Sequence, residues 1–263
     1  MKGYHRTVVA DGELWLASGF EEAADELGLG KRSRWESLIA GGKAAGRGRI
    51  AFVENSSRHM TLKQLRRGGA LGSLWRDRFP SRERLTANLS TPTLARERGV
   101  STPAALALLL VSGPPGLWRG WLALETVPRA RDMMQRVLQQ TPTAEVWGEV
   151  LAVVHSLHDA GIDHPDLNLG NLLLDEDGKA WVIDLDGCSV HSTTLDTDRR
   201  IDAIRRVERS YLKTCFLNDV TTDQAIHWPA AYAPGDAVLA ARWDERSGRD
   251  LAKLERHRRA WRR

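Results

Sequence analysis

The order of apolar and polar residues predicts a strand hairpin at the centre of the chain. Residues 172–174 and 181–183 are short apolar runs that read as buried strands, and the Asp-Glu-Asp-Gly segment at 175–178 is a turn between them. A hairpin returns the chain to its starting point. We therefore expect Asp184, directly after the second strand, to lie near Asn171, directly before the first.

The residues on either side of this hairpin have helical periodicity. Apolar residues at Val146, Val150, Val153, Val154 and Leu157 follow the three-to-four spacing of one helix face. Thr141-Pro142-Thr143 is a helix start, and Ala160-Gly161 is an end. Residues 129–140 and 197–216 are expected to be further helical segments, which makes the second half of the chain mostly helical, and residues 246–263 are a final Arg-rich segment.

The first half instead favours strands. Asp11-Gly12 joins two strands at 6–10 and 13–17 as a hairpin, and a short helix is expected at 20–29. The remaining expected elements are strands at 50–54 and 60–65, a helix at 80–98 interrupted by Pro92, and strands within 99–112 and 117–127. This is the pattern of an antiparallel sheet with a helix.

Composition indicates a globular protein that works in the cytoplasm. The chain has 263 residues, of which 42% are hydrophobic and 27% are charged. The longest apolar run, near residues 104–111, is too short to span a bilayer, and charged residues follow the N-terminus where a signal peptide would be apolar. Cys188 and Cys215 lack the spacing of a zinc site or a disulfide framework.

The charge balance favours anionic partners. The formal net charge is +4, and basic residues are concentrated near residues 31–34, 63–67, 76–84 and 256–263. Such clusters suit phosphates, nucleic acid or an acidic membrane surface. A solvated surface of an Arg-rich chain is the alternative for any one cluster.

The chemistry-bearing residues stand around the central hairpin. His164-x-Asp166-Leu167-x-x-x-Asn171, followed by Asp184 at a strand end, has the order and spacing of a kinase catalytic loop and its metal-binding aspartate. Phosphoryl transfer from ATP needs a carboxylate for the incoming hydroxyl and oxygen ligands for Mg²⁺. Asp166 is the predicted base, and Asn171 and Asp184 are the predicted metal ligands. Two polar turns flanking a surface hairpin are the alternative interpretation.

The predicted nucleotide-binding residues lie in the first half. The Gly-rich segment 41–49 precedes a strand, so the backbone at Gly46 and Gly48 can approach phosphates closely. It is not a Walker A motif, because Ala44 follows Gly42-Lys43. Lys63, on the second strand after this segment, is the candidate for the α- and β-phosphates, with an ordinary edge-strand lysine as the alternative.

A hinge is predicted at residues 125–128, where the backbone of Glu125 and Val127 would bind adenine. A kinase also expects a helix glutamate that pairs with the strand lysine. Glu83 and Glu97 are the candidates within the helix predicted at 80–98.

With these residues placed, the chain resembles the lipopolysaccharide kinase family, which includes 3-deoxy-D-manno-octulosonic acid (Kdo) kinase and lipopolysaccharide heptose kinase. The likeness covers roughly residues 46–213, and its most specific parts are Asp166-Leu167-Asn168-x-x-Asn171 and Ile183-Asp184-x-Asp186. The other matching segments are residues 62–69, 76–79, 98–103 and 158–161.

The resemblance implies an α+β, two-lobed, protein-kinase-like fold with an antiparallel N-lobe sheet, one N-lobe helix and a mostly helical C-lobe. The expected division is an N-lobe at 1–124, a hinge at 125–128 and a C-lobe at 129–263. It also implies ATP and Mg²⁺ as cofactors and a sugar hydroxyl of the lipopolysaccharide inner core as acceptor. The protein would be cytoplasmic, with peripheral contact at the inner membrane through its basic C-terminal segment and no nucleic-acid partner.

Two departures from the family pattern bear on the nucleotide site. The position of the helix glutamate, eleven residues before Gly99, holds Asn88. Lys63 stands where family members often have arginine. These departures leave open a pseudokinase that acts as an interaction module.

Other kinases are alternatives of a different kind. A phosphotransferase of the aminoglycoside or choline kinase type shares His-x-Asp and Ile-Asp, but its acceptor pocket is usually acidic. A protein kinase fits less well, because Pro165 replaces an arginine and Asp186 replaces the glycine of Asp-Phe-Gly. Nucleic-acid binding rests only on the basic tail.

Overall fold

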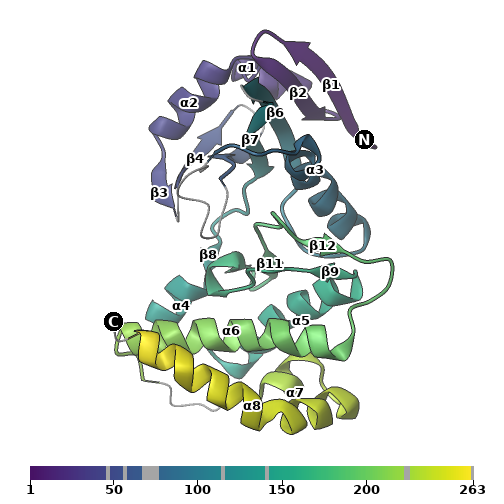
Figure 1. Cartoon of the computed structure of the whole chain (residues 1–263). Helices are drawn as coiled ribbons and strands as arrows, with labels where there is room; N and C mark the ends of the chain where they lie inside the picture. Colours follow the sequence, from purple (N-terminus) through teal and green to yellow (C-terminus); the bar gives the residue numbers. More distant parts are fainter. Residues whose placement is uncertain are drawn as a thin grey trace. The chain divides into compact units, whose positions relative to one another are not determined.

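The computed structural model describes residues 1–45, 48–55, 58–66, 77–113, 116–139, 142–221 and 226–261 (Figure 1). The chain forms two compact units. The N-terminal unit comprises residues 1–94 and 103–127, and the C-terminal unit comprises residues 95–102 and 128–263. Each unit is built around its own core.

A seven-stranded antiparallel sheet is the framework of the N-terminal unit. Its strands lie in the order β1-β2-β6-β7-β5-β4-β3. They are β1 (Tyr4–Val9), β2 (Gly12–Ala17), β3 (Lys43–Ala45), β4 (Gly48–Glu54), β5 (His59–Gln64), β6 (Ala105–Gly113) and β7 (Leu117–Glu125). The central strands β6 and β7 are the most apolar, as expected for strands that are covered on both faces.

The predicted N-terminal hairpin is present, and its turn lies one residue earlier than expected. Val9 pairs with Gly12, so Ala10 and Asp11 form the loop. Gly12 is required by a close approach of two backbones, because a Cβ at this position would lie 2.0 Å from the carbonyl oxygen of Leu110. The hairpin is thereby joined edge to edge with β6.

Helices cover both faces of this sheet and create two separate cores. On one face, α1 (Glu21–Glu26) and α2 (Arg32–Ala40) contribute to a core with Met60 and Leu62. Trp35 of α2 is fully buried there, and its indole N–H donates to the carbonyl oxygen of Leu29 at 2.8 Å. On the other face, α3 (Arg82–Glu97) packs Leu85 and Leu89 against strand residues. The sequence pattern predicts α1 and α3 but not α2.

Helix α3 runs through Pro92 without a break, which corrects the predicted interruption. Proline removes one helix hydrogen bond and costs about 3 kcal/mol in a helix interior. The burial of Leu85 and Leu89 before it and Ala95 after it holds both halves in one helix. Thr93 adds a local bond, because its hydroxyl donates to the carbonyl oxygen of Leu89 at 2.8 Å.

The C-terminal unit is mostly helical. Its helices are α4 (Met133–Gln139), α5 (Ala144–Asp159), α6 (Thr197–Leu217), α7 (Trp228–Tyr232) and α8 (Ala237–Trp261). Its short strands and one 3-10 turn are β8 (Arg131–Asp132), β9 (Ile162–Asp163), η2 (Leu169–Asn171), β10 (Leu172–Leu174), β11 (Ala180–Val182) and β12 (Ser189–Val190). The central hairpin β10–β11 pairs Leu172 with Val182, as the sequence predicts.

Helix α5 lies at the centre of the C-terminal core. Thr143 caps it by accepting a hydrogen bond from the Val146 N–H at 3.4 Å, and its apolar face is buried as the periodicity predicts. Trp147 contacts Tyr211 of α6 and Trp228 of α7 edge to face, with ring centroids 5.3 and 5.2 Å apart. These aromatic contacts join three helices.

Helices α4 and α8 differ from what the sequence pattern predicts. The α4 helix begins at Met133 rather than Arg129, because Arg129 has a positive φ of 49° and the carboxylate of Asp132 accepts from the Gln135 N–H at 2.7 Å. The sequence pattern predicts no helix at 237–261, where the structure has α8, and Asp236 accepts from the Leu239 N–H at its start. Among the described helices, none is long and apolar enough to cross a bilayer.

Residues 95–102 are grouped with the C-terminal unit, whereas the expected boundary kept them in the N-lobe. Ala95 and Val100 are buried in the helical core. The carbonyl oxygen of Ser101 accepts from the Val182 N–H at 3.0 Å, and Arg98 donates to the carbonyl oxygen of Ala160. This segment therefore behaves as part of the structure that carries the central hairpin.

Candidate active site

The candidate catalytic loop begins where α5 ends. Gly161 adopts a positive φ of 70°, and a Cβ there would lie 2.5 Å from the carbonyl oxygen of Thr193. The chain can make this turn only with a glycine. It then forms β9, which pairs with β12, so Ile162 is opposite Val190 and Asp163 is opposite Ser189. The pairing of β9 with β12 therefore fixes the point at which the catalytic loop begins.

His164 connects the two halves of the site. Its ring is buried, Nδ1 accepts from the Asp166 N–H at 3.2 Å, and Nε2 donates to the carbonyl oxygen of Ile183 at 3.3 Å. An acceptor nitrogen requires the neutral ring, and burial lowers the pKa of His164 below its ordinary value. One imidazole thus holds the backbone beside both Asp166 and Asp184.

Two asparagine amides fix the loop after Asp166. The side-chain amides of Asn168 and Asn171 donate to the main-chain carbonyl oxygen of Asp166 at 2.9 and 2.8 Å. Asn168 also caps η2 by accepting from the Gly170 N–H at 2.9 Å. The Asp166 side chain is exposed and is therefore accessible to a hydroxyl group from solvent.

Asp184 lies beside Asn171, as the hairpin predicts. The Ile183 N–H donates to the carbonyl oxygen of Asn171 at 2.9 Å. Asp184 itself has φ of 62°, in the left-handed region that non-glycine residues seldom adopt. Such outliers cost of order 1–3 kcal/mol and are concentrated at functional sites. The Asp184 side chain is exposed.

The oxygen chemistry of Asn171 and Asp184 fits a magnesium ion. Because the Asn171 amide nitrogen binds a carbonyl group, its Oδ1 remains as an acceptor. Mg²⁺ prefers oxygen ligands and is usually held by one or two protein groups with the rest supplied by water and phosphates. No cluster of three or more His, Cys, Asp or Glu side chains suited to a metal occurs in the described part of the chain.

Helix α6 packs against the catalytic loop and contacts its backbone. The sequence pattern does not predict these contacts. The Arg206 guanidinium Nη2 donates to the carbonyl oxygen of His164 at 3.2 Å and lies 3.4 Å from the Asp163 carboxylate. Ser210, one turn later, accepts from the Leu169 N–H at 3.2 Å. No local pattern in the sequence indicates these contacts, because they form only when α6 folds back on the loop.

The predicted nucleotide-binding residues belong to the N-terminal unit. Gly48 begins β4, and Lys63 lies on β5 opposite Ile50 and Leu122. Lys63 shares its sheet face with Leu122, which is in the core under α3. Gly46 lies outside the described residues. The structure therefore places Lys63 on the α3 side of the sheet.

The predicted hinge residues end β7. The Glu125 N–H donates to the carbonyl oxygen of Ala104 at 2.8 Å, and the Thr126 N–H donates to that of His59 at 3.1 Å. Among the described residues, the Val127 backbone N–H makes no hydrogen bond within the protein. Val127 is also the last residue of the N-terminal unit.

An asparagine occupies the α3 position where a kinase would have the glutamate that pairs with the strand lysine. Asn88 is buried, and its Nδ2 donates to the carbonyl oxygens of Leu85 at 3.2 Å and Arg84 at 3.4 Å in its own helix. The two glutamates suggested as substitutes, Glu83 and Glu97, are both exposed, and Glu83 accepts from the Ser81 hydroxyl at 2.8 Å. Neither replaces a buried glutamate at position 88.

Asp175 and Cys188, which lie near the central hairpin, have environments that do not suit a metal-binding or reactive role. The Asp175 carboxylate accepts from the N–H groups of Asp177 and Lys179 and from the Trp181 indole, so the 175–178 segment is a turn. The Cys188 thiol lies among Asp184, Asp186 and Asp163, and burial together with these carboxylates raises its pKa. A raised thiol pKa excludes a reactive thiolate near neutral pH.

Buried neutral histidines should make stability depend on pH. His158 is fully buried in α5, its Nδ1 lies 2.7 Å from the Tyr232 hydroxyl, and burial lowers its pKa to about 3. The folded state therefore disfavours a proton that the unfolded chain takes up below about pH 6.5. The stability from this group is complete above that pH and is lost as pH falls.

We expect the free energy of unfolding to drop by about 1.4 kcal/mol between pH 7.5 and 5.5 from His158 alone. Urea denaturation at both pH values measures it. His158→Asn is the matched variant, because an asparagine amide can keep the bond to Tyr232 without titrating. Equal pH dependence in both proteins would contradict the assignment.

Comparison with known proteins identifies the family of the chain. The model of the lipopolysaccharide kinase (Kdo/WaaP) family matches residues 36–231. A 3-deoxy-D-manno-octulosonic acid kinase of Vibrio cholerae is 32% identical over 177 residues, which are 65% of this chain and 73% of that protein. The kinase of the same name from Vibrio vulnificus is 28% identical over 212 residues, covering 78% and 85% of the two chains.

A solved structure shares the fold. WaaP in complex with acyl carrier protein matches with a TM-score of 0.61 and 19% identity, covering 94% of this chain and 98% of that one. This likeness supports the two-lobed α+β kinase fold. The chain belongs to the lipopolysaccharide kinase (Kdo/WaaP) family, and it is a phosphotransferase with an alcohol group as acceptor.

Proposed function

We propose that this protein transfers the γ-phosphoryl group of ATP to a hydroxyl of a Kdo residue in the lipopolysaccharide inner core. The observation that carries the proposal is the catalytic loop, in which His164 and Asn171 together hold the backbone of Asp166. The identity to curated Kdo kinases favours Kdo over heptose as the acceptor sugar.

Asp166 is the residue proposed to act on the acceptor. Its exposed carboxylate would accept a hydrogen bond from the sugar hydroxyl and take its proton as the new oxygen–phosphorus bond forms. The bond between the γ-phosphorus and the β–γ bridging oxygen breaks in the same step, and ADP leaves. The three backbone contacts on Asp166 and its neighbours keep the carboxylate in position, which is the main protein contribution to such a reaction.

Asn171 Oδ1 and the Asp184 carboxylate would hold Mg²⁺. When bound, the ion neutralises the charge of the phosphates during transfer. The protein's part is to fix its two ligands relative to each other. The hydrogen bond from Ile183 N–H to the Asn171 carbonyl oxygen and the bond from His164 to the Ile183 carbonyl oxygen do this.

Lys63 is proposed to bind the nucleotide phosphates, with the backbone at Gly46 and Gly48 covering them and the hinge backbone at Glu125 and Val127 binding adenine. Asn88 changes one part of this arrangement. Its amide donates to carbonyl groups of α3, so it cannot supply the negative charge that a glutamate would give to a lysine.

The acceptor is expected to be anionic, and the basic residues of the C-terminal unit support this choice over a cationic acceptor such as an aminoglycoside or choline. Kdo carries a carboxylate, and lipid A carries phosphates. Because such an acceptor is lipid-linked, peripheral contact with the inner membrane stays a prediction.

Transfer of labelled γ-phosphate from Mg-ATP to purified Kdo-bearing lipid A tests the proposal. The expected result is label in the lipid that depends on both Mg²⁺ and the Kdo residue, with lipid A lacking Kdo as the control. Label in a heptose-bearing core but not in Kdo-lipid A would shift the acceptor to heptose. Mg-ATP binding without transfer to either lipid would favour a small-molecule acceptor, and failure to bind ATP would favour a pseudokinase.

A further inference from the structure

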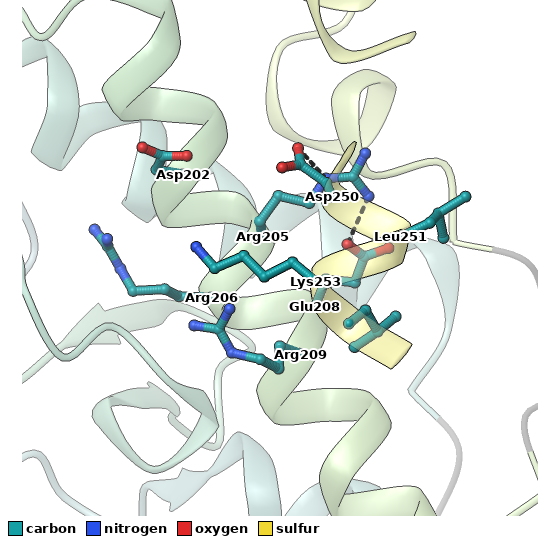
Figure 2. Close-up of a pocket in the computed structure, with 9 residues that line it drawn as sticks. Asp202, Arg205, Arg206, Glu208, Arg209, Asp250, Leu251 and Lys253 are labelled. Carbon is teal, nitrogen blue, oxygen red and sulfur yellow. Dashed lines mark hydrogen bonds and ion pairs between the residues drawn. The ribbon is translucent and has the colours of Figure 1, made fainter. Parts of the chain in front are cut away.

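A cavity of about 140 Å³ opens between α6 and α8 in the C-terminal unit (Figure 2). Both of its walls are strongly charged. Three carboxylates and four basic side chains line it, so its character depends on which of these charges already have partners.

Salt bridges within the wall neutralise the carboxylates. Glu208 accepts from Arg205 at 2.7 Å, and Asp250 lies 3.4 Å from Arg205 and 3.7 Å from Arg246. Asp202 is bound by Arg246. Figure 2 shows Arg205 turned toward Asp250 and Glu208. These pairs join α6 to α8, and they leave no carboxylate in the cavity for its remaining cations.

Three basic side chains remain: Arg206 and Arg209 on α6, and Lys253 on α8. Figure 2 shows them on the side of α6 opposite the Arg205 guanidinium, with Lys253 reaching across from α8. Within the described residues, Arg209 and Lys253 make no hydrogen bond or salt bridge through their side chains. Burial, and then the nearby Arg206, lowers the pKa of Arg209.

Arg206 already lies 3.4 Å from the Asp163 carboxylate, whereas Arg209 and Lys253 make no ion pair among the described residues, so an anion in the cavity would stabilise these two side chains. Two guanidinium groups that repel each other and are partly removed from water cost stability. His257 on the next turn of α8 is affected too, because burial and then the charges of Arg209 and Lys253 lower its pKa. If the residues served only to hold α6 against α8, carboxylates would be expected opposite them, as they are opposite Arg205 and Arg246.

The cavity is connected to the catalytic loop through Arg206. Besides lining the cavity, Arg206 donates to the carbonyl oxygen of His164, two residues before Asp166. A group bound by Arg206 and Arg209 would therefore lie near the residue proposed to act on the sugar hydroxyl. That position suits an anionic group on the acceptor itself.

We propose that this cavity binds a phosphate group of the acceptor, held by Arg209 and Lys253 with Arg206 at its inner end. The inference rests on the proposed function, because it assigns the bound phosphate to the molecule that is phosphorylated. Guanidinium forks match phosphate oxygens in pairs, and the ammonium group of lysine adds a point charge. The cavity volume of about 140 Å³ is sufficient for one phosphate group.

The test compares two acceptors and three variants. Kdo-bearing lipid A is used with its phosphates and after phosphatase treatment. Arg209→Gln and Lys253→Gln each remove one proposed phosphate contact. Arg249→Gln is the control: Arg249 is on α8, has a side chain that is 72% exposed and does not line the cavity, and the loss of its 3.9 Å contact with Asp250 leaves that carboxylate paired with Arg205 and Arg246.

With the phosphorylated acceptor, Arg209→Gln is expected to raise KM for the acceptor about tenfold while kcat and KM for ATP stay near native values. Lys253→Gln should act in the same direction with a smaller effect, and Arg249→Gln should match the native protein. With the dephosphorylated acceptor, the native KM should already be high, and Arg209→Gln should raise it no further. An equal rise for both acceptors would overturn the proposal.

A binding measurement separates this site from the proposed function. Calorimetric titration with pyrophosphate, after the nucleotide site is filled with Mg-ADP, should show binding to native protein and about tenfold weaker binding to Arg209→Gln. Its thermal unfolding checks that the variant is folded. If Arg209→Gln loses pyrophosphate binding but keeps the native KM for both acceptors, the site takes free phosphate and the proposal is wrong.

Two further outcomes distinguish a failure of the proposed Kdo kinase function from a failure of the proposed phosphate-binding cavity. Pyrophosphate binding that depends on Arg209, in a native protein that phosphorylates no Kdo-bearing lipid, would refute the proposed function and with it the assignment of the phosphate to that acceptor. Transfer to Kdo-lipid A with no pyrophosphate binding and an unchanged KM in Arg209→Gln would refute the cavity alone.

Discussion

Asp166→Asn is expected to lower kcat for phosphoryl transfer by roughly 10²–10⁴-fold, the usual size of a general-base contribution. Asparagine has nearly the same shape but cannot accept the proton of the acceptor hydroxyl. The backbone contacts from His164, Asn168 and Asn171 involve the main chain of residue 166, so they persist in the variant. KM for ATP and thermal stability should therefore stay close to native.

Asp177→Asn is the matched control for this change. Asp177 is an exposed residue of the turn between β10 and β11, and its recorded hydrogen bond is made by its backbone N–H. Asp177→Asn removes one negative charge, as Asp166→Asn does, but at a position away from the catalytic loop. Retention of more than a tenth of native kcat in Asp166→Asn would remove Asp166 from its proposed role as base.

Asp184→Asn is expected to reduce kcat by about 10²–10³-fold, comparable to the loss of a single group that stabilises developing charge. Part of this loss should be recovered at high Mg²⁺ concentration, because the variant weakens a metal ligand and leaves Asn171 in place. The positive φ of Asp184 decides the choice of substitution. Asparagine tolerates the left-handed region, whereas alanine would add backbone strain to the loss of the ligand.

Activity measured as a function of Mg²⁺ concentration, together with thermal unfolding without nucleotide, separates these effects. Asp184→Asn should unfold at nearly the native temperature and require more Mg²⁺ for half-maximal rate. Asp184→Ala should be less stable as well as less active. An unchanged Mg²⁺ requirement in Asp184→Asn would mean that Asp184 is not a metal ligand.

The parts of the fold that sequence predicted well are those encoded by local patterns. The spacing of Val146, Val150 and Leu157 and the cap at Thr143 specify α5 because its buried face repeats with the helix period. The turn at 175–178 specifies the pairing of Leu172 with Val182, and hence the position of Asp184 beside Asn171. These elements carry the predicted catalytic and metal-binding residues.

The errors have different physical causes. Helix α2 had a usable signal in Trp35, Leu38 and Ile39, which occupy one helix face, but charged residues between them obscured it. Pro92 predicts an interruption of α3, but burial of the surrounding apolar residues keeps this helix continuous. The start of α4 depended on the cap at Asp132.

Contacts between distant segments could not be predicted from local patterns at all. Arg206 contacts His164 from 42 residues along the chain, and Tyr232 contacts His158 from 74 residues along it. Both contacts depend on how α6 and α7 return to the loop and to α5. A single sequence therefore predicts candidate catalytic and metal-binding residues but not the residues that hold them in place.

The grouping of residues 95–102 with the C-terminal unit limits how this kinase can be divided into modules. A gene fragment that starts at residue 128 would lack Val100 in its core and the Ser101 carbonyl group that pairs with Val182. Exchange of lobes between relatives by a single crossover at the hinge would thus combine a helical core with a foreign segment. A chimera that transfers residues 95–102 together with the C-terminal unit keeps that core intact.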